Sequence, residues 1–596
     1  RNVVVFGHGG CGKTSLVDSM CYVAGNTNRK GDIDKGSALT DFTPEETAHK
    51  ISINLGVAHA RWHGTKINLI DTPGYLDFFG EVMAGMRVAD SGLCVIDAVH
   101  GVEVGTERTW AAADFQGLPR MIFVSLMDRD NANFQKTFRQ IQKTLTAAAI
   151  PVQVPIGAGN NFKGIVNLLS MKAHLFKRGD KGNYEETDIP EELTSDVETF
   201  REQLIEAIVA ADDELLEAYF GGEDLDPKQV LEVLGKAIRN GDVVPVFCGA
   251  GVNSWGIRTL LDKITELMPS PVEVAPQIVK NRDGETEIRA ESTSATAALV
   301  FKTTSEPQVG DLSYFRVFGG RITNGLTLLN PQHSANERIA HLAIPQGAQR
   351  LDVDSLSPGD IGVVAKLRDT HTGDTLCATN NKLVLESVMW PSTDISLAVT
   401  AQTRGDEDKI GTGLAKLHEE DPTFTSGYDP ERSQTIIRGL GEMHLNISLE
   451  KLTRKYGVNV ETHAPRIAYR ETITKSAEGR GRHKKQSGGR GQFGDCHVRL
   501  SPLGRGKGYE FVSSIKGGVI PTKFIPAVNK GINSASTKGV LAGYPLVDFR
   551  AECYDGSHHA VDSSEIAFQI AGSVAFRKVA LNAKPVILEP IMEVEV

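Results

Sequence analysis

The segment Gly7–Thr14 has the sequence GHGGCGKT, follows the apolar run Val3–Phe6 and precedes the helical pattern Ser15–Met20. In a strand, glycine loop and helix of this kind, backbone N–H groups surround a phosphate and the helix N-terminus adds partial positive charge. The Lys of such a loop reaches the β and γ oxygens, and the Thr hydroxyl binds Mg²⁺. The sequence therefore predicts nucleotide binding by Gly9, Gly10, Gly12, Lys13, Thr14 and Ser15.

An acidic motif at the end of a later strand supports this prediction. The strand pattern Lys66–Ile70 is followed by Asp71–Gly74, DTPG. An acidic residue at a strand end beside a phosphate loop holds the water shell of Mg²⁺, and a glycine amide there senses a γ-phosphate. Asp71 and Gly74 are therefore predicted to join the nucleotide site, with Thr14 and Asp71 holding the metal.

Length and composition fit a protein of several globular domains. The chain has 596 residues, of which 40% are hydrophobic and 23% charged. From the usual size of a domain, we expect about four domains in a chain of this length. No apolar run reaches transmembrane length and no signal peptide precedes the first strand, so we expect a cytoplasmic protein without membrane contact. The seven cysteines lie far apart without zinc spacing, which indicates reduced thiols.

Charge is unevenly distributed along the chain. The net charge is −11, yet residues 471–596 hold 17 Lys and Arg against 12 Asp and Glu. A basic C-terminal part on an acidic body suggests one domain that contacts phosphate backbones, although a merely solvated imbalance would give the same count.

Strands alternate with helices in the first part of the chain. Strand patterns at Gly92–Asp97 and Met121–Val124 flank a helical pattern at residues 104–115, which predicts a parallel sheet with helices on its faces. From Gly25 to about Lys50 the apolar periodicity is lost. This segment is either a surface loop or a switch that becomes ordered on nucleotide binding.

Two further sequence motifs lie downstream of DTPG. Ser125–Asp128 reads SLMD and Phe247–Ala250 reads FCGA. Together with GHGGCGKT and DTPG, they follow one another as in elongation factor G, and the chain resembles this family of translational GTPases over nearly its whole length. The resemblance implies GTP or GDP with Mg²⁺ as ligands. It also implies the ribosome, through rRNA and stalk proteins, with tRNA and mRNA as partners, and a monomer off the ribosome.

Tyr75 is the most consequential departure from that family, because it stands where the family has the histidine that positions the attacking water. A phenol with a pKa near 10 does not replace an imidazole in the same geometry, and loss of such a group costs on the order of 10² to 10⁴ in rate. We expect Tyr75 and Gly74 to form the catalytic position and hydrolysis to be slow. The alternative is that the Tyr75 hydroxyl orients the water and activity is ordinary.

Other departures lie around the phosphates and the Mg²⁺ ion. Gly10 takes the place of a side chain that helps to hold a monovalent cation in the family. The switch threonine of the family is matched by Ser52, which keeps a hydroxyl for Mg²⁺ beside Thr14 and Asp71.

The predicted guanine site lacks several side chains that the family has there. Ser125 and Leu126 replace the Asn and Lys of the family motif, and Ala250 replaces a serine in the last guanine loop. Asp128 remains and can accept both N–H groups of guanine. It should still prefer guanine to adenine, because adenine would leave the carboxylate unpaired at a cost of about 1–3 kcal/mol.

The fold class predicted is multidomain α/β and β, with a P-loop GTPase domain, a β-barrel and two-layer α+β domains.

The predicted insert at about residues 150–245 contains an acidic helical stretch over residues 190–218. This stretch is either a stalk-protein contact implied by the resemblance or an ordinary solvated face. His444 is expected to be structural. The expected divisions are a GTPase domain at 1–275 with an inserted subdomain at about 150–245, a barrel at 295–390, α+β domains at 395–470 and 471–586, and the start of a further domain at 587–596.

A basic, glycine-rich loop and a histidine loop suggest an RNA contact. Glycines let the backbone approach, arginines reach phosphates and an aromatic ring can stack on a base, although a disordered basic loop would have the same composition. In the resembling family these loops form the domain tip that approaches tRNA and mRNA. The residues concerned are Arg482, Lys484, Lys485, Arg490, Gln492, Phe493, His558 and His559.

The function predicted is that of a divergent, second-copy elongation factor G, which binds GTP and the ribosome and promotes tRNA–mRNA translocation. One alternative is a non-hydrolysing, GTP-gated ribosome-binding protein that regulates or protects. Another is a factor in ribosome recycling.

Overall fold

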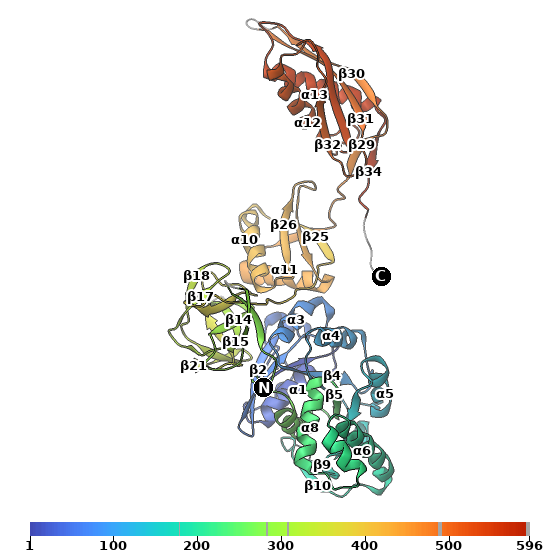
Figure 1. The fold of residues 1–596 in the computed structure, drawn as a ribbon, viewed down its shortest axis with the longest axis vertical. Coiled ribbons are helices and arrows are strands. Elements are labelled where there is room, and N and C mark those ends of the chain that lie inside the picture. Colours follow the sequence, from blue (N-terminus) through green and yellow to red (C-terminus); the bar gives the residue numbers. More distant parts are fainter. Residues whose placement is uncertain (178, 282–283, 307–308, 487–490, 592–596) are drawn as a thin grey trace. The chain divides into compact units, whose positions relative to one another are not determined.

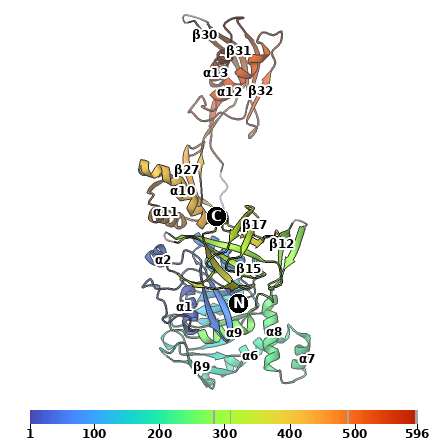
Figure 2. The same ribbon diagram turned by 90° about the vertical axis from the view of Figure 1, so that its left-hand side faces the viewer.

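A computed structural model describes residues 1–177, 179–281, 284–306, 309–486 and 491–591. The chain forms two compact units, one of residues 1–427 with 435–463 and the other of residues 428–434 with the described chain from 464 (Figures 1 and 2). Within this described part, no helix has both the length and the apolar character needed to cross a membrane.

The first unit begins with a seven-stranded sheet in the order β2-β3-β1-β4-β5-β11-β6. Its pairs are parallel except β2 with β3. The order places β1 next to β3 and β4, so the loops that follow these three strands meet at one edge of the sheet. The strands are β1 (Asn2–Phe6), β2 (Gly56–Trp62), β3 (Thr65–Asp71), β4 (Ser91–Asp97), β5 (Arg120–Ser125), β6 (Ala149–Pro151) and β11 (Val244–Cys248).

Helices cover this sheet, whose central strands are fully buried because both faces are packed. The strands predicted from the sequence are present, most of them slightly longer, and the helix predicted at residues 104–115 is confirmed. The helices are α1 (Lys13–Val23), α2 (Pro44–His49), α3 (Phe79–Arg87), α4 (Val104–Phe115), α5 (Phe134–Thr144) and α9 (Ile257–Leu267).

The segment without periodicity contains the short helix α2. Thr43 and Glu46 cap it reciprocally, since the Thr43 hydroxyl accepts from the Glu46 N–H and the Glu46 carboxylate accepts from the Thr43 N–H. Six residues are too few for a periodic pattern, which explains why hydrophobic periodicity does not indicate this helix.

The insert forms an antiparallel sheet, β10-β9-β8-β7, with three helices, and both views place it at the end of this unit away from α10. The acidic stretch 190–218 is divided rather than continuous, because residues 210–212 separate α6 from α7. The elements are β7 (Gln153–Ile156), β8 (Gly164–Asn167), β9 (Lys172–Phe176), β10 (Tyr184–Thr187), α6 (Thr194–Val209), α7 (Asp213–Phe220) and α8 (Pro227–Asn240).

The next part is an eight-stranded antiparallel sheet in the order β18-β17-β23-β14-β15-β22-β19-β20, which curves into a barrel-like body (Figure 1). Two smaller sheets flank it, β13-β12-β24 and β16-β21. The main strands are β14 (Ala297–Glu306), β15 (Gly310–Gly319), β17 (Thr327–Asn330), β18 (Ala335–Arg338), β19 (Ala343–Gln346), β20 (Gln349–Asp352), β22 (Ile361–Ala365) and β23 (Thr375–Ala378); the others are β12 (Gln277–Asn281), β13 (Gly284–Ile288), β16 (Ile322–Thr323), β21 (Ser355–Leu356) and β24 (Val384–Leu385).

A two-layer α+β part follows, with α10 and α11 on the sheet β26-β27-β25-β28. The helix expected at Ile410–Glu420 begins six residues earlier, at Arg404, where the polar sequence RGDEDK hides it. His444 is buried beside Asp421 (2.9 Å), as expected of a structural residue. The elements are β25 (Ile395–Ala401), β26 (Thr425–Asp429), β27 (Gln434–Gly439), β28 (Val460–His463), α10 (Arg404–Glu420) and α11 (Glu442–Tyr456).

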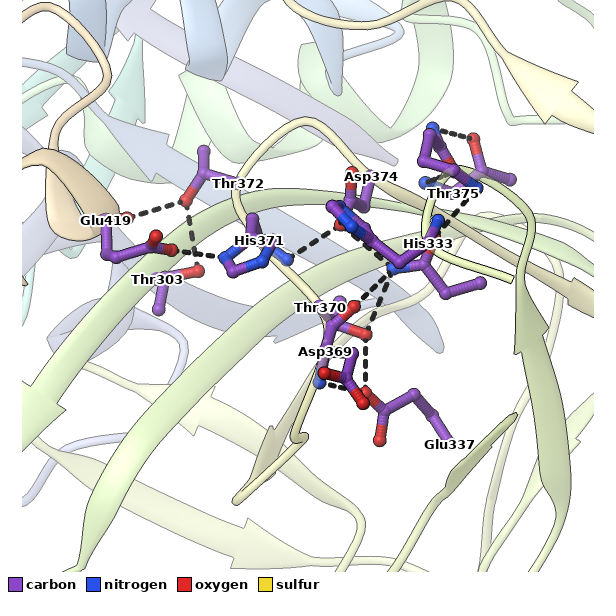
Figure 3. Close-up of polar contacts among 12 residues, drawn as sticks. Thr303, His333, Glu337, Asp369, Thr370, His371, Thr372, Asp374, Thr375 and Glu419 are labelled. Atoms are coloured by element: carbon purple, nitrogen blue, oxygen red, sulfur yellow. Dashed lines mark hydrogen bonds and ion pairs between the residues drawn. The ribbon is translucent and has the colours of Figure 1, made fainter. Parts of the chain in front are cut away.

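A polar network joins α10 to the barrel. Figure 3 shows His371, on the loop before β23, directed at Glu419 of α10, to which it is hydrogen-bonded. The Thr372 hydroxyl donates to the Glu419 carbonyl (3.3 Å) and lies within hydrogen-bond distance of the Thr303 hydroxyl on β14 (3.0 Å). These contacts fix the helix against the barrel strands.

The second unit has the sheet β30-β31-β33-β32 with α12 and α13, and a separate pair β29-β34. Gly481 and Gly494 lie where a side chain would strike the α13 backbone, so glycine is what lets this helix approach the sheet. The elements are β29 (Arg470–Ile473), β30 (Ala477–Lys485), β31 (Gln492–Pro502), β32 (Tyr509–Ser513), β33 (Phe549–Ser557), β34 (Pro585–Leu588), α12 (Ile525–Ser536) and α13 (Glu565–Asn582).

A buried ion pair fastens the barrel to the nucleotide domain. Arg316 on β15 pairs with Asp90 (2.5 Å), and both side chains are almost completely buried. We expect Arg316→Met to lower the free energy of unfolding by about 3–5 kcal/mol, because it leaves a buried carboxylate without its cation. Denaturant unfolding measures this.

The matched control is Arg350→Met, which removes an exposed pair with Glu306 on the same barrel and should cost at most about 1 kcal/mol. Equal losses in the two variants would contradict the prediction.

Candidate functional site: a nucleotide pocket and a basic tip

The phosphate loop leads directly into the first turn of α1. Gly12 precedes α1 in the left-handed region (φ +91°) and supplies no side-chain cap, so the first N–H groups of the helix point outward without an internal partner. Gly10 also has positive φ (+80°). The Lys13 ammonium lies back along the loop, where it donates to the carbonyls of Gly7 (3.0 Å) and His8 (2.6 Å). Ser15 follows in the first turn.

The predicted metal ligands come together beside this loop. The hydroxyl groups of Thr14 and Ser52 are 3.1 Å apart, and Ser52 donates to Asp41 (2.9 Å). Thr40 donates to one oxygen of Asp71 (2.6 Å), whereas the other oxygen, Oδ1, is buried without a hydrogen-bond partner among the described residues.

Electrostatics at this point favour a cation. Burial raises the pKa of Asp71, although hydrogen bonds from Thr40 and Thr14 oppose the rise. Burial, and then the charge of Asp71, raises the pKa of Asp41. Crowded carboxylates and an orphaned oxygen beside two hydroxyls are a set that Mg²⁺ fits with water and phosphate oxygens as its other ligands. Within the described chain, no cluster of three or more His, Cys, Asp or Glu side chains could hold a metal by itself.

Tyr75 lies against the phosphate loop. A Cβ on Gly9 would meet the Tyr75 ring at 3.2–3.4 Å, so the ring occupies the space that a side chain at position 9 would fill. The Tyr75 side chain is 40% exposed, and its hydroxyl makes no hydrogen bond within the described part of the chain. Gly74 is equally close-packed, since a Cβ there would lie 2.5 Å from the Gly9 nitrogen and against the Lys13 ammonium.

The four predicted base-site residues lie on two neighbouring loops. Met127 N donates to Gly249 O (3.2 Å), which joins the loop of Ser125 and Asp128 to that of Ala250. Ser125 Oγ is buried without a hydrogen-bond partner in the described structure. Asp128 instead accepts a hydrogen bond from the Asn253 amide (2.6 Å).

The switch segment is attached to the α+β part. Glu45 of α2 receives two hydrogen bonds from Arg454 of α11 (2.6 and 3.0 Å), and Lys451 donates to Asn54 (3.0 Å). The segment that carries Ser52 therefore has a second anchor outside the nucleotide domain.

In the second unit the described start of β31 lies beside the predicted histidine loop. Phe493 N donates to Asp562 O (2.9 Å), and the rings of Phe493 and His559 are 6.3 Å apart. The Arg482 guanidinium lies over the Phe493 ring at 5.6 Å. His558 contacts Val519 O through Nδ1 (3.1 Å). Lys484, Lys485 and Gln492 are exposed at the same end of β30 and β31, and Arg490 lies outside the described residues.

Sequence reasoning missed three polar residues near the nucleotide. Asp41 and Lys30 belong to the segment without periodicity, in which no pattern singles out a residue. Asn253 lies three residues after Ala250, and the only available signal was its place on the last guanine loop.

Comparisons with known proteins agree with this geometry. Residues 1–270 match the elongation factor Tu GTP binding domain, 295–379 elongation factor G domain 2, 390–464 elongation factor G domain III and 465–584 elongation factor G domain IV. Elongation factor G of Thermotoga maritima is 42% identical over 602 residues, which cover 100% of this chain and 87% of the relative. The chain belongs to the elongation factor G family.

Further relatives give the same picture. Elongation factor G of Thermotoga sp. strain RQ2 is 41% identical over 100% of this chain and 86% of its own length. A crystal structure of a protein from Thermus thermophilus has a TM-score of 0.87 and 36% identity over 98% of this chain and 85% of that one. The protein is therefore a GTP-binding translation elongation factor, and its family is a family of GTPases.

The close packing at Gly74 gives a direct test of the phosphate site. We expect Gly74→Ala to weaken GTP binding at least about 10-fold, because the added methyl displaces Lys13 and overpacking costs about 1–3 kcal/mol. Equilibrium titration with GTP measures this. Gly411→Ala on α10, where no atom lies within 4 Å of the added carbon, should leave binding unchanged. Unchanged affinity in Gly74→Ala would contradict the proposed site.

Proposed function

We propose that this elongation factor G homologue binds the ribosome in its GTP form, promotes movement of tRNA and mRNA, and hydrolyses GTP slowly. The observation that carries the slow-hydrolysis part is Tyr75 packed on Gly9, with its hydroxyl bonded to none of the described residues. A neutral phenol neither takes a proton from water nor carries a compensating charge.

The imidazole of His8 belongs to the phosphate loop but already contacts other residues. His8 accepts the Gly105 N–H at Nδ1 (3.2 Å) and faces Glu103 through Nε2 (3.5 Å). Its ring is therefore held toward α4, and the proposal gives it no part in activating water.

In the proposed mechanism the protein works by a population shift. Thr14, Ser52 and Asp71 would hold Mg²⁺, whose charge would offset that of the crowded carboxylates and favour order in the segment that carries Ser52. That order reaches α11 through the Glu45–Arg454 pair, so the arrangement of the first unit depends on the nucleotide. Hydrolysis, where it occurs, loosens the segment and releases the factor.

Further parts of the proposal follow the family. They are a contact of the acidic stretch 190–218 with ribosomal stalk proteins, a tip that meets rRNA, tRNA and mRNA, a monomer off the ribosome and a cytoplasmic location. The same proposal retains the domain divisions at 275, 295–390, 395–470 and 471–586.

The test of slow hydrolysis is multiple-turnover GTP cleavage with and without ribosomes, with GTP binding measured separately. We expect Tyr75→His to raise the turnover number at least about 10-fold, because an imidazole at this position can orient water. Tyr75→Phe, which removes only the hydroxyl, should behave like the unmodified protein. Fast ribosome-stimulated turnover that is lost in Tyr75→Phe would show instead that the tyrosine hydroxyl positions the water.

The tip has its own test. We expect Arg482→Gln to slow translocation about 5-fold or more at unchanged GTP affinity, since it removes a cation that faces the phosphate backbone in the proposed complex. Arg499→Gln is the matched control, because this arginine on β31 is already paired with Glu478 and Glu552. Equal translocation rates for both variants would contradict an RNA contact at the tip.

Tyr75 also favours a second candidate function, a GTP-gated regulatory or protective factor. Ribosome binding that depends on GTP, without translocation in the same assay, would select that function. Splitting of ribosomes without translocation would select recycling.

A further inference from the structure

The base end of the nucleotide pocket contains two side chains that no family motif supplies. The pocket has a volume of about 1020 Å³ and is lined by the phosphate loop, by the segment from Asn28 to Asp41 and by the loop Val252–Ser254. Lys30 comes from the second of these and Asn253 from the third.

Asn253 takes over the support of Asp128. The expected neighbour, Ser125, has its hydroxyl buried about 3.1 Å from where a Cβ on Gly12 would lie, and this oxygen has no partner in the described structure. The Asn253 amide donates to Asp128 Oδ2 at 2.6 Å. Each carboxylate oxygen accepts two hydrogen bonds, so Asn253 can stay in place while Asp128 accepts the N1–H and the exocyclic N–H of guanine.

Lys30 holds the loop from which Asn253 projects. Its ammonium donates to the carbonyls of Gly251 (2.9 Å) and Val252, the two residues before Asn253. The side chain is half-buried, and burial lowers the pKa of Lys30, although the carboxylates of Asp18 and Asp128 oppose this shift. Lys30 thus joins the segment that precedes α2 to the base loop.

We propose that Lys30 and Asn253 are positioning residues for guanine, which hold Asp128 and the base loop in place of the missing Asn and Lys of the family motif. The inference rests on the proposed nucleotide site and adds a consequence. Guanine affinity is coupled to the order of the segment that carries Lys30, because that segment clamps the base loop.

The experiment compares GDP with inosine diphosphate and ADP by titration calorimetry on the full chain. Inosine lacks the exocyclic amino group, so a correctly aimed Asp128 binds GDP more tightly than the inosine nucleotide. We expect Asn253→Ala to weaken GDP about 10-fold and inosine diphosphate about 2-fold. Asn253→Asp, which sets a second carboxylate against Asp128, should weaken GDP more than Asn253→Ala does.

The chain offers matched controls for both residues. Asn160 donates to Asp130 (3.2 Å) in an exposed pair near the base loop, so Asn160→Ala removes an equivalent hydrogen bond away from the base. Lys30→Met should weaken GDP about 5-fold, Lys30→Arg should restore most of the loss, and Lys172→Met, which loses an exposed pair with Asp188 outside the pocket, should have no effect.

The outcomes separate this inference from the proposed function. If the unmodified chain binds GDP no more tightly than ADP, the guanine site and the inference both fail. If it selects GDP but Asn253→Ala keeps the same ratio of GDP to inosine diphosphate affinity, the inference alone is overturned. An equal effect of Asn160→Ala or Lys172→Met would likewise overturn it.

Discussion

The first backbone N–H groups of α1 have no acceptor within the helix. The other parts of the candidate nucleotide site lie around them. Gly12 begins the first turn of α1 with a positive φ, a conformation that favours glycine over residues with a side chain. The parallel order of β3, β1 and β4 then brings the ends of three strands to the same edge. Asp71 therefore arrives beside Thr14, although 57 positions separate them in the numbering.

Changes at the nucleotide site come in compensating pairs. Tyr75 is larger than the histidine expected there, and Gly9 has no side chain, so the ring occupies the vacated space. Ser125 is shorter than the expected asparagine, and Asn253 from another loop supplies the amide instead. In the first case the ring fills the space beside the loop, and in the second an amide hydrogen bond supports Asp128.

Motifs and long periodic elements could be predicted from the sequence. The glycine loop, β3 with its terminal Asp71 and the helix at residues 104–115 each have a local signal, because their residues interact within a few positions of one another. The helix α2 and the first turn and a half of α10 had weaker signals, since one is six residues long and the other starts in a charged run. Lys30 had none, because its partners Gly251 and Val252 lie more than 200 positions away.

Residue type and local spacing predict the residues for phosphate and Mg²⁺, and the resemblance to elongation factor G predicts the guanine site and Tyr75 in the place of a histidine. The polar groups that meet across the chain emerged only from the folded arrangement. In it, Tyr75 lies on Gly9, Asp128 accepts from Asn253, and Glu45 joins α2 to Arg454 of α11. Contacts of this kind depend on how sheets and helices pack, and no spacing along the chain encodes them locally.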